Sequence, residues 1–168
     1  MVPRRRVAVE LGLSGQAARQ VEIFLGEHRH HAWHRQDVLD LLEGERQFLP
    51  CTEPGSGEVT LVNRDHIVWL AMAASEDRSP SDEETPDLDL LYDHCHHVSL
   101  RLGMGTAIDG ALLHSAPSDH ARLADHVNQP GGFLSVHAGD QVILVRKSAV
   151  IEIIESEPGD QRPEENAR

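Results

Sequence analysis

The strongest constraint on the fold is an internal match between the two halves of the chain. Five blocks of the first half recur in the second half in the same order, and the spacing changes only at expected loops. A match of this length indicates two copies of one supersecondary unit. The matched blocks are 7–12 with 98–103, 21–25 with 110–114, 38–42 with 123–127, 48–51 with 133–136, and 61–68 with 144–151.

Hydrophobic alternation predicts the same strands in both halves. Val7, Val9 and Leu11 alternate with small or polar residues, which is the period of a half-buried strand, and the block at 98–103 behaves likewise. Further strands are expected at 21–25, 106–114, 48–51 and 133–136. A long apolar stretch closes each half, at 59–72 and 142–154, and its polar interruptions at 63–65 and 146–148 predict a bend into two strands.

A short helix is expected between the second and third strands of each half. In the first half the apolar positions lie within 38–42, and Gly44 is a suitable stop. In the second half they lie within 123–127, and Ser118 is a suitable N-cap. Each half is therefore predicted to be a β-β-α-β-β unit.

The predicted fold class is α+β and β-rich. The small β-β-α-β-β unit is expected to be duplicated, and each copy is expected to be a small barrel or sandwich-like. A unit of roughly 60 residues buries a marginal core alone, so the two halves are expected to pack together with pseudo-twofold symmetry. We expect a first repeat over 5–73, an acidic flexible linker over 74–96, a second repeat over 97–155 and a disordered acidic tail over 156–168.

The charge pattern supports this division. The chain has 168 residues and a formal net charge of -13, and the segment 75–97 alone carries eight acidic residues and one basic residue. Such segments read as solvated spacers, or as docking segments for a basic partner. Two cysteines are too few for a disulfide framework, and no apolar run approaches a membrane span. We expect a cytoplasmic protein without a membrane partner.

Nucleic-acid binding is not expected. It needs a face of Lys or Arg side chains on phosphates, and the basic runs are only Arg4-Arg5-Arg6 and Arg146-Lys147. Aromatic residues that could stack on bases make up 4 % of the chain.

Histidine is the most unusual component, with twelve in the chain. One cluster is His28, His30, His31 and His34, and the other is His94, Cys95, His96 and His97. Both are expected in loops. His30 and His34 have the spacing of a helical zinc pair, and His94 and His96 would share one face of a strand. Neither cluster is a complete signature, so solvated histidines, a metal site and a pH-sensitive surface all stay open.

No catalytic, cofactor-binding or metal-ligating residue is assigned. Asp40 and Asp125 occupy equivalent helix positions, and a structural role is expected for them. Cys51 is expected to be a buried apolar filler, whereas Cys95 is expected to be exposed. Nucleophile elbows, phosphate loops and dinucleotide fingerprints are absent from the sequence.

These observations predict a non-catalytic protein-interaction or assembly module, not an enzyme, whose partner is another protein or a second copy. Two alternatives stay open: a metal- or small-ligand-responsive regulator that uses the histidine-rich loops, and an enzyme without a legible motif. Contacts are expected at the outward strand edges, at Trp33 and Trp69, and at the basic turns Arg64 and Arg146-Lys147.

Overall fold

The structure is a computed structural model, and it describes residues 5–26, 34–74 and 92–156. The first half contains five strands and one α-helix. In chain order they are β1 (Arg5–Leu13), β2 (Arg19–Leu25), α1 (His34–Glu43), β3 (Phe48–Thr52), β4 (Val59–Asn63), the 3-10 turn η1 (Arg64–His66) and β5 (Ile67–Ala73).

The second half has the same succession of strands and helix, with two additional 3-10 turns. Its elements are β6 (His94–Leu102), η3 (Gly103–Gly105), β7 (Ala107–His114), η4 (Ser118–His120), α3 (Leu123–Val127), β8 (Phe133–Ala138), β9 (Gln141–Arg146), η5 (Lys147–Ala149) and β10 (Val150–Ser156). The expected β-rich class is confirmed.

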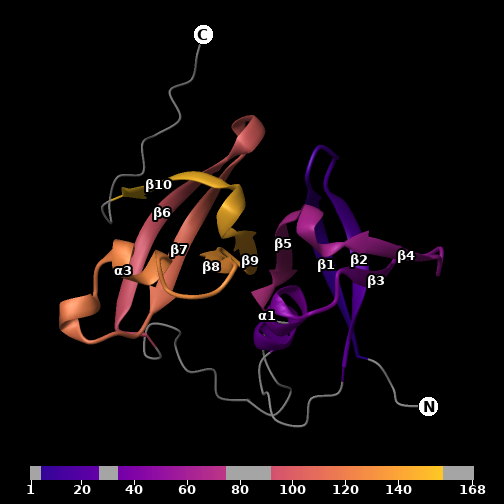
Figure 1. Cartoon of the computed structure of the whole chain (residues 1–168), viewed down its shortest axis with the longest axis horizontal. Helices are drawn as coiled ribbons and strands as arrows, with labels where there is room; N and C mark the ends of the chain where they lie inside the picture. Colours follow the sequence, from indigo (N-terminus) through magenta and orange to yellow (C-terminus); the bar gives the residue numbers. More distant parts are fainter. Residues whose placement is uncertain (1–4, 27–33, 75–91, 157–168) are drawn as a thin grey trace.

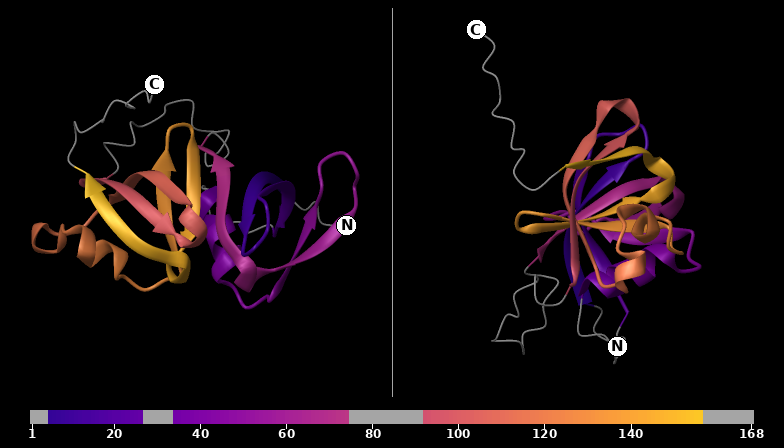
Figure 2. Two further views of the ribbon diagram at one scale, coloured as in Figure 1. Left: turned by 90° about the horizontal axis from the view of Figure 1, so that it is seen from above. Right: turned by 90° about the vertical axis from the view of Figure 1, so that its left-hand side faces the viewer.

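All ten strands join one antiparallel sheet that does not close on itself. The order of the strands is β10-β6-β7-β8-β9-β5-β1-β2-β3-β4. Figure 1 shows two lobes side by side, and Figure 2 shows the strong curvature of the strands within each lobe. A single continuous open sheet therefore takes the place of the expected pair of small barrels or sandwiches.

The packing of the two halves differs from the expected pseudo-twofold arrangement. A twofold relation would pair the same strand of each half at the junction. The junction instead pairs β5, the last strand of the first half, with β9, the fourth strand of the second half. The expectation was wrong because each half ends in two different strands, its fourth and its last. The junction joins the last strand of the first half to the fourth strand of the second half, so unlike edges pair.

Two apolar clusters pack against this sheet. The first is centred on the alternating residues of β1 and β2, such as Val9 and Ile23, and α1 covers it with Val38 and Leu42. The second is centred on β6 and β7 and receives Leu123 and Val127 from α3. The alternation read from the sequence thus corresponds to the buried faces of the strands.

The predicted helices and bends are confirmed, with local differences. α1 ends at Glu43, directly before Gly44, and the polar interruptions form η1 and η5. Ser118 is not the N-cap of α3, because residues 118–120 form a separate 3-10 turn and α3 begins after Arg122. β6 begins at His94, three residues before the expected start of the second repeat.

Helices that are long and apolar enough for a membrane span do not occur in the described part of the chain.

Candidate functional site

The junction between the halves is a regular stretch of antiparallel pairing. Five consecutive residues of β5 pair with five of β9, from Trp69 opposite Val145 to Ala73 opposite Gln141. β5 also pairs with β1, and β9 also pairs with β8. Both junction strands are therefore interior strands, whose backbone groups have partners on both sides.

Three side chains of the second half complete the core of the first half. Phe133, Val142 and Leu144 belong to the first-half cluster, and their exposed fractions are 8 %, 1 % and 0 %. Without the junction, the first-half core would open to solvent along β5. Burial of aliphatic and aromatic side chains of this size stabilises the contact by roughly 1.5–3 kcal/mol each.

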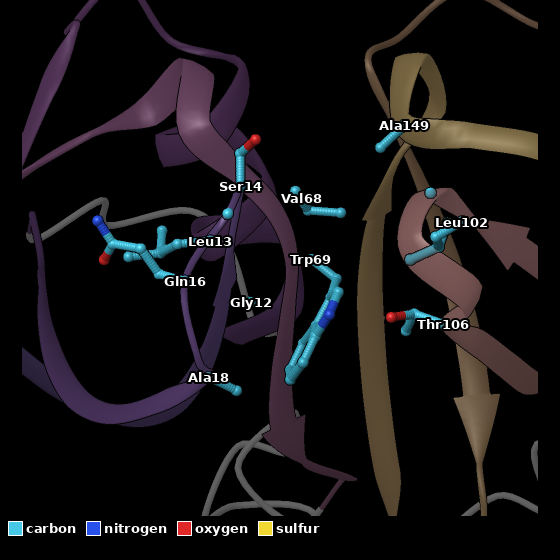
Figure 3. A pocket seen from close by; sticks show the side chains of 12 residues that line it. Gly12, Leu13, Ser14, Gln16, Ala18, Val68, Trp69, Leu102, Thr106 and Ala149 are labelled. Carbon is cyan, nitrogen blue, oxygen red and sulfur yellow. The ribbon is translucent and has the colours of Figure 1, made fainter.

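Trp69 lies on the opposite face of the junction. Its indole packs against the second-half cluster, and Figure 3 shows it in the space between β5 and the segment that carries Leu102 and Thr106. Trp69 was expected at a contact surface, and its contact lies at the junction between the two halves of the chain. A Cβ atom at Gly12 would lie 2.2 Å from the indole ring, so the ring requires glycine at that position.

A cleft of about 570 Å³ opens beside Trp69, between the first turn of the first half and η3 of the second. Its twelve lining residues are small, apolar or neutral polar, and none of them is ionisable. Ser14 and Thr106 supply the hydroxyl groups. The cleft can hold an apolar group, but its lining offers no acid–base pair.

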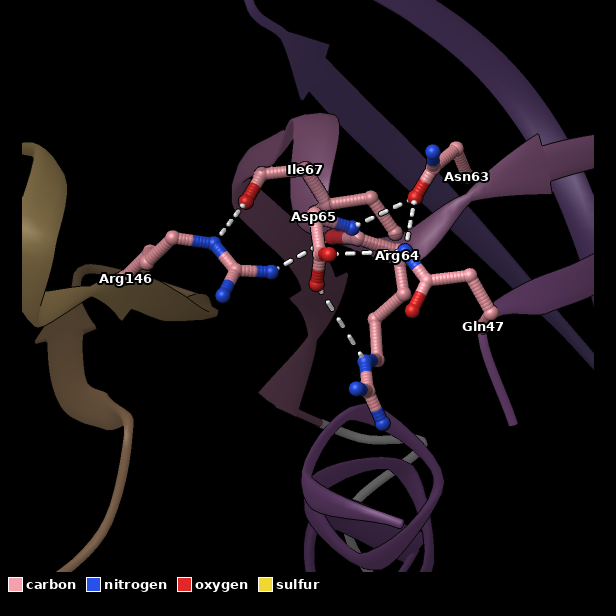
Figure 4. Close-up of polar contacts among 6 residues, drawn as sticks. All are labelled: Gln47, Asn63, Arg64, Asp65, Ile67 and Arg146. Atoms are coloured by element: carbon pink, nitrogen blue, oxygen red, sulfur yellow. Dashed lines mark hydrogen bonds and ion pairs between the residues drawn. The ribbon is translucent and has the colours of Figure 1, made fainter. Parts of the chain in front are cut away.

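Arg146 joins the two halves through backbone carbonyls (Figure 4). Its Nε donates to the carbonyl of Ile67 at 2.7 Å, and its Nη2 donates to the carbonyl of Arg64 at 2.5 Å. The guanidinium also lies 4.8 Å from the centre of the Phe133 ring, in a cation–π contact. This residue was expected to contact an external partner, and the structure gives it an internal role.

Polar groups of the first half frame this contact. Gln47 donates to Asn63 Oδ1 at 2.8 Å and to Asp65 Oδ2 at 2.7 Å. The hydrogen bond from Gln47 lowers the pKa of Asp65 below its usual value, so the carboxylate is ionised near Arg64 and Arg146 at neutral pH. These bonds hold η1 in the shape that presents the carbonyl of Arg64 to Arg146.

The two ends of the sheet, β4 and β10, have no neighbour on their outer sides among the described strands. Among the described residues, the large hydrophobic side chains that are exposed lie on or beside these two ends. They are Phe48, Val59 and Leu61 at the β4 end, and Ile151 and Ile154 on β10. Unpaired backbone groups flanked by exposed apolar side chains are the features of a strand that pairs with another chain.

A cluster of four histidines occupies the far side of the second half. His94 and His96 lie on one face of β6, His114 lies at the end of β7, and His126 lies on α3. The His114 ring stacks on His126 at 4.3 Å and on His96 at 5.2 Å between ring centres. The shared face of His94 and His96 was predicted correctly, but their placement in a loop was wrong, because both lie in a strand.

The contacts of this cluster connect β6 to Glu155 of β10 and to the segment that precedes α3, and the His114–His126 stack connects β7 to α3. The ring of His96 lies 2.6 Å from a carboxylate oxygen of Glu155 and 3.1 Å from the carbonyl of Ala121. Burial lowers the pKa of His126 to about 4, with smaller contributions from His114, His96 and Lys147, and burial also lowers the pKa of His114. Within the described part of the chain, the Nδ1 atoms of His114 and His126 have no hydrogen-bond partner.

Among the residues that the structure describes, no group of three or more His, Cys, Asp or Glu side chains could hold a metal ion. His28, His30, His31 and Trp33 lie outside the described residues, and α1 begins at His34. Metal binding by the first cluster therefore stays one of the open alternatives, beside solvated histidines and a pH-sensitive surface.

The remaining candidates occupy separate places. Cys51 is buried, as expected, and burial raises its pKa to about 11. Cys95 is exposed, as expected. Asp40 and Asp125 are exposed on helices of different halves.

The amino-acid sequence did not reveal that His114 and His126 join the histidine cluster, or that Val59 and Leu61 are exposed. The hydrophobic pattern gave no signal for either, because both depend on which strands become neighbours.

Comparisons of the chain with protein-family models, with curated proteins and with solved structures found no match.

Proposed function

We propose that the protein is a non-catalytic protein-interaction and assembly module, built from two copies of one β-β-α-β-β unit. Its binding sites are the two unpaired edges of the sheet, at β4 and at β10. The observation that carries the proposal is the concentration of exposed large hydrophobic side chains at these edges.

The element bounds support the duplication. β5 runs from 67 to 73 and β10 runs from 150 to 156, so both ends differ by 83 residues. The turns η1 and η5, at 64–66 and 147–149, differ by the same 83 residues. This is the spacing at which the blocks 61–68 and 144–151 match in the sequence.

The lining of the cleft supports the non-catalytic assignment. Catalysis usually needs a nucleophile, an acid–base pair or a metal set that converges on one concave site. The cleft beside Trp69 has no ionisable lining residue. The clustered histidines contact the carbonyl of Ala121, just before α3, and the Glu155 carboxylate on β10, and they stack on one another between β7 and α3, which supports a structural role.

The test compares two edge variants with a control in binding assays. The β4 variant carries Val59→Lys and Leu61→Lys, and the β10 variant carries Ile151→Lys and Ile154→Lys. The control carries Ala8→Lys and Ala107→Lys, at exposed positions of β1 and β7, which are paired on both sides.

Tagged versions of the three variants and of the wild type are incubated with purified untagged chain and, separately, with a lysate of the source cell. We expect the wild type and the control to bind a partner. We expect each edge variant to bind it at least tenfold more weakly. The proposal would be overturned if both edge variants bound as tightly as the wild type, or if the wild type bound no protein.

A further inference from the structure

We infer that the partner at both edges is a second copy of this chain, bound head to tail, with β10 of one molecule pairing with β4 of the next. The inference rests on the proposed function and adds the identity of the partner.

The junction inside the chain is the template for this contact. It joins the last strand of one half to the fourth strand of the other half. The edge left free in the first half is its fourth strand, β4, and the edge left free in the second half is its last strand, β10. One molecule thus has, at its two free edges, a fourth strand and a last strand. These are the same two kinds of strand that pair at the internal junction. Contacts between two different surfaces repeat from copy to copy and build rings or filaments.

The exposed side chains at the β4 end repeat those that are buried at the internal junction. Phe48, Val59 and Leu61 are 54 %, 61 % and 64 % exposed. The residues at the matching positions of the second half are again a phenylalanine, a valine and a leucine: Phe133, Val142 and Leu144. Those three insert into the core of the neighbouring half and are at most 8 % exposed.

The β10 end offers the surface that would receive them. Val150 and Ile153 are half-buried and pack on the second-half cluster. Their matching positions in β5, Ile67 and Leu70, are each 1 % exposed. Ile67 and Leu70 are less exposed because the neighbouring strand β9 covers that side of β5 at the internal junction. Val150 and Ile153 have no such neighbour among the described strands, so part of their surface stays uncovered.

The register of the internal junction specifies the register between molecules. Each β5 residue is replaced by the β10 residue 83 positions later, and each β9 residue is replaced by the β4 residue 83 positions earlier. Leu70 pairs with Leu144 inside the chain, so Ile153 is expected opposite Leu61 of the next copy. Ala73 pairs with Gln141, so Ser156 is expected opposite Glu58. Five residue pairs would form, as at the internal junction.

One difference makes the intermolecular contact weaker than its template. Asn63 occupies the place of Arg146, and its side chain accepts hydrogen bonds from Gln47 and from the backbone of Asp65 within its own molecule. The guanidinium that bridges to two carbonyls at the internal junction has no counterpart at β4. We therefore expect assembly that is reversible and depends on concentration.

Sedimentation velocity of the full chain over a wide concentration range tests the inference. The wild type and the Ala8→Lys/Ala107→Lys control are expected to exceed the mass of a dimer as concentration rises. The β4 variant (V59K/L61K) and the β10 variant (I151K/I154K) are each expected to stay monomeric.

The deciding measurement mixes the two edge variants in equal amounts. The β10 variant has an intact β4, and the β4 variant has an intact β10, so the mixture is expected to form a one-to-one dimer that grows no further. A dimer formed by either variant alone would show a contact between like edges and would overturn the inference.

Other outcomes are equally clear. A wild type that is monomeric at every concentration would overturn self-assembly. If such a monomer bound another protein through β4 or β10, the proposed function would stand while this inference failed. Circular dichroism checks that each variant is folded; if the β4 double variant is not, the single substitution Val59→Lys at an exposed position takes its place.

Discussion

The indole of Trp69 occupies the space that a side chain at residue 12 would need: a Cβ atom built on Gly12 lies 2.2 Å from the ring. Gly12 is on β1 and Trp69 is opposite it on β5. The close approach lets the indole lie flat against the first half while its other side meets the second-half cluster. A single glycine therefore determines how the central aromatic residue contributes to the junction.

Gly12→Ala is expected to displace the Trp69 ring and destabilise the protein by about 1–3 kcal/mol, the usual cost of overpacking. Urea unfolding measures the free energy. Tryptophan fluorescence in a Trp33→Phe background reports the altered environment of Trp69. The matched control is Gly26→Ala, because nothing lies within 4 Å of a Cβ at that position. An unchanged spectrum and stability in Gly12→Ala would contradict the packing described.

Arg146→Ala is expected to lower the free energy of unfolding by about 2–3 kcal/mol, because it removes two charge-assisted hydrogen bonds to carbonyls of the first half. Arg146→Lys is expected to recover only part of the loss, since one ammonium group does not reproduce the planar fork. The comparison is Arg101→Ala, which breaks an exposed ion pair with Glu152 and is expected to cost below 1 kcal/mol. Equal losses in the two alanine variants would contradict the assigned role.

The histidine cluster predicts a dependence of stability on pH. The pKa of His126 is about 4 in the folded protein, against an ordinary value of 6.5. The unfolded chain therefore binds more protons than the folded chain between these values, so stability is full above pH 6.5 and falls as the pH decreases toward 4.

His126→Phe keeps a ring for stacking on His114 and removes this titration. Between pH 7 and pH 5, the free energy of unfolding of the variant is expected to fall by about 1–2 kcal/mol less than that of the wild type. Urea unfolding at the two pH values measures both free energies. His120→Gln is the control, since His120 is exposed and contacts Asp119 rather than the cluster. A wild-type profile that the His126 substitution leaves unchanged would argue against a neutral, half-buried His126.

Asn63→Arg is expected to strengthen head-to-tail assembly by roughly tenfold, about 1.4 kcal/mol. The new guanidinium would stand where Arg146 stands at the internal junction and would have Phe48 beside it, as Arg146 has Phe133. The readout is the midpoint concentration of assembly in sedimentation velocity, with Asn63→Gln as a neutral control. Equal midpoints for the two variants would indicate that the intermolecular contact does not copy the internal one.

The local elements were predictable because their signals are local. Alternation at Val7, Val9 and Leu11 records which face of β1 is buried, and that face is the same whichever strand lies beside it. The helices at 38–42 and 123–127, the bends at η1 and η5, and the burial of Cys51 follow from similar short-range patterns.

The assignment of Trp69 was half determined by the sequence. The sequence marked it as a contact residue, but only the neighbouring β9 and η3 show which surface it meets. The histidines divide in the same way: the spacing of His94 and His96 places them on one face, while His114 and His126 join them through strand pairing and the docking of α3.

The sequence by itself determined the strands, the helices and the buried face of each. Only the tertiary structure decided which edges pair, and so why Leu144 is buried while Leu61, the same residue type in the same kind of strand, is 64 % exposed. The physical reason is that side-chain alternation encodes a face of the sheet, whereas an edge is defined by backbone groups that every residue carries. Pairing of an edge depends on which strand remains unpaired once the rest of the sheet has formed.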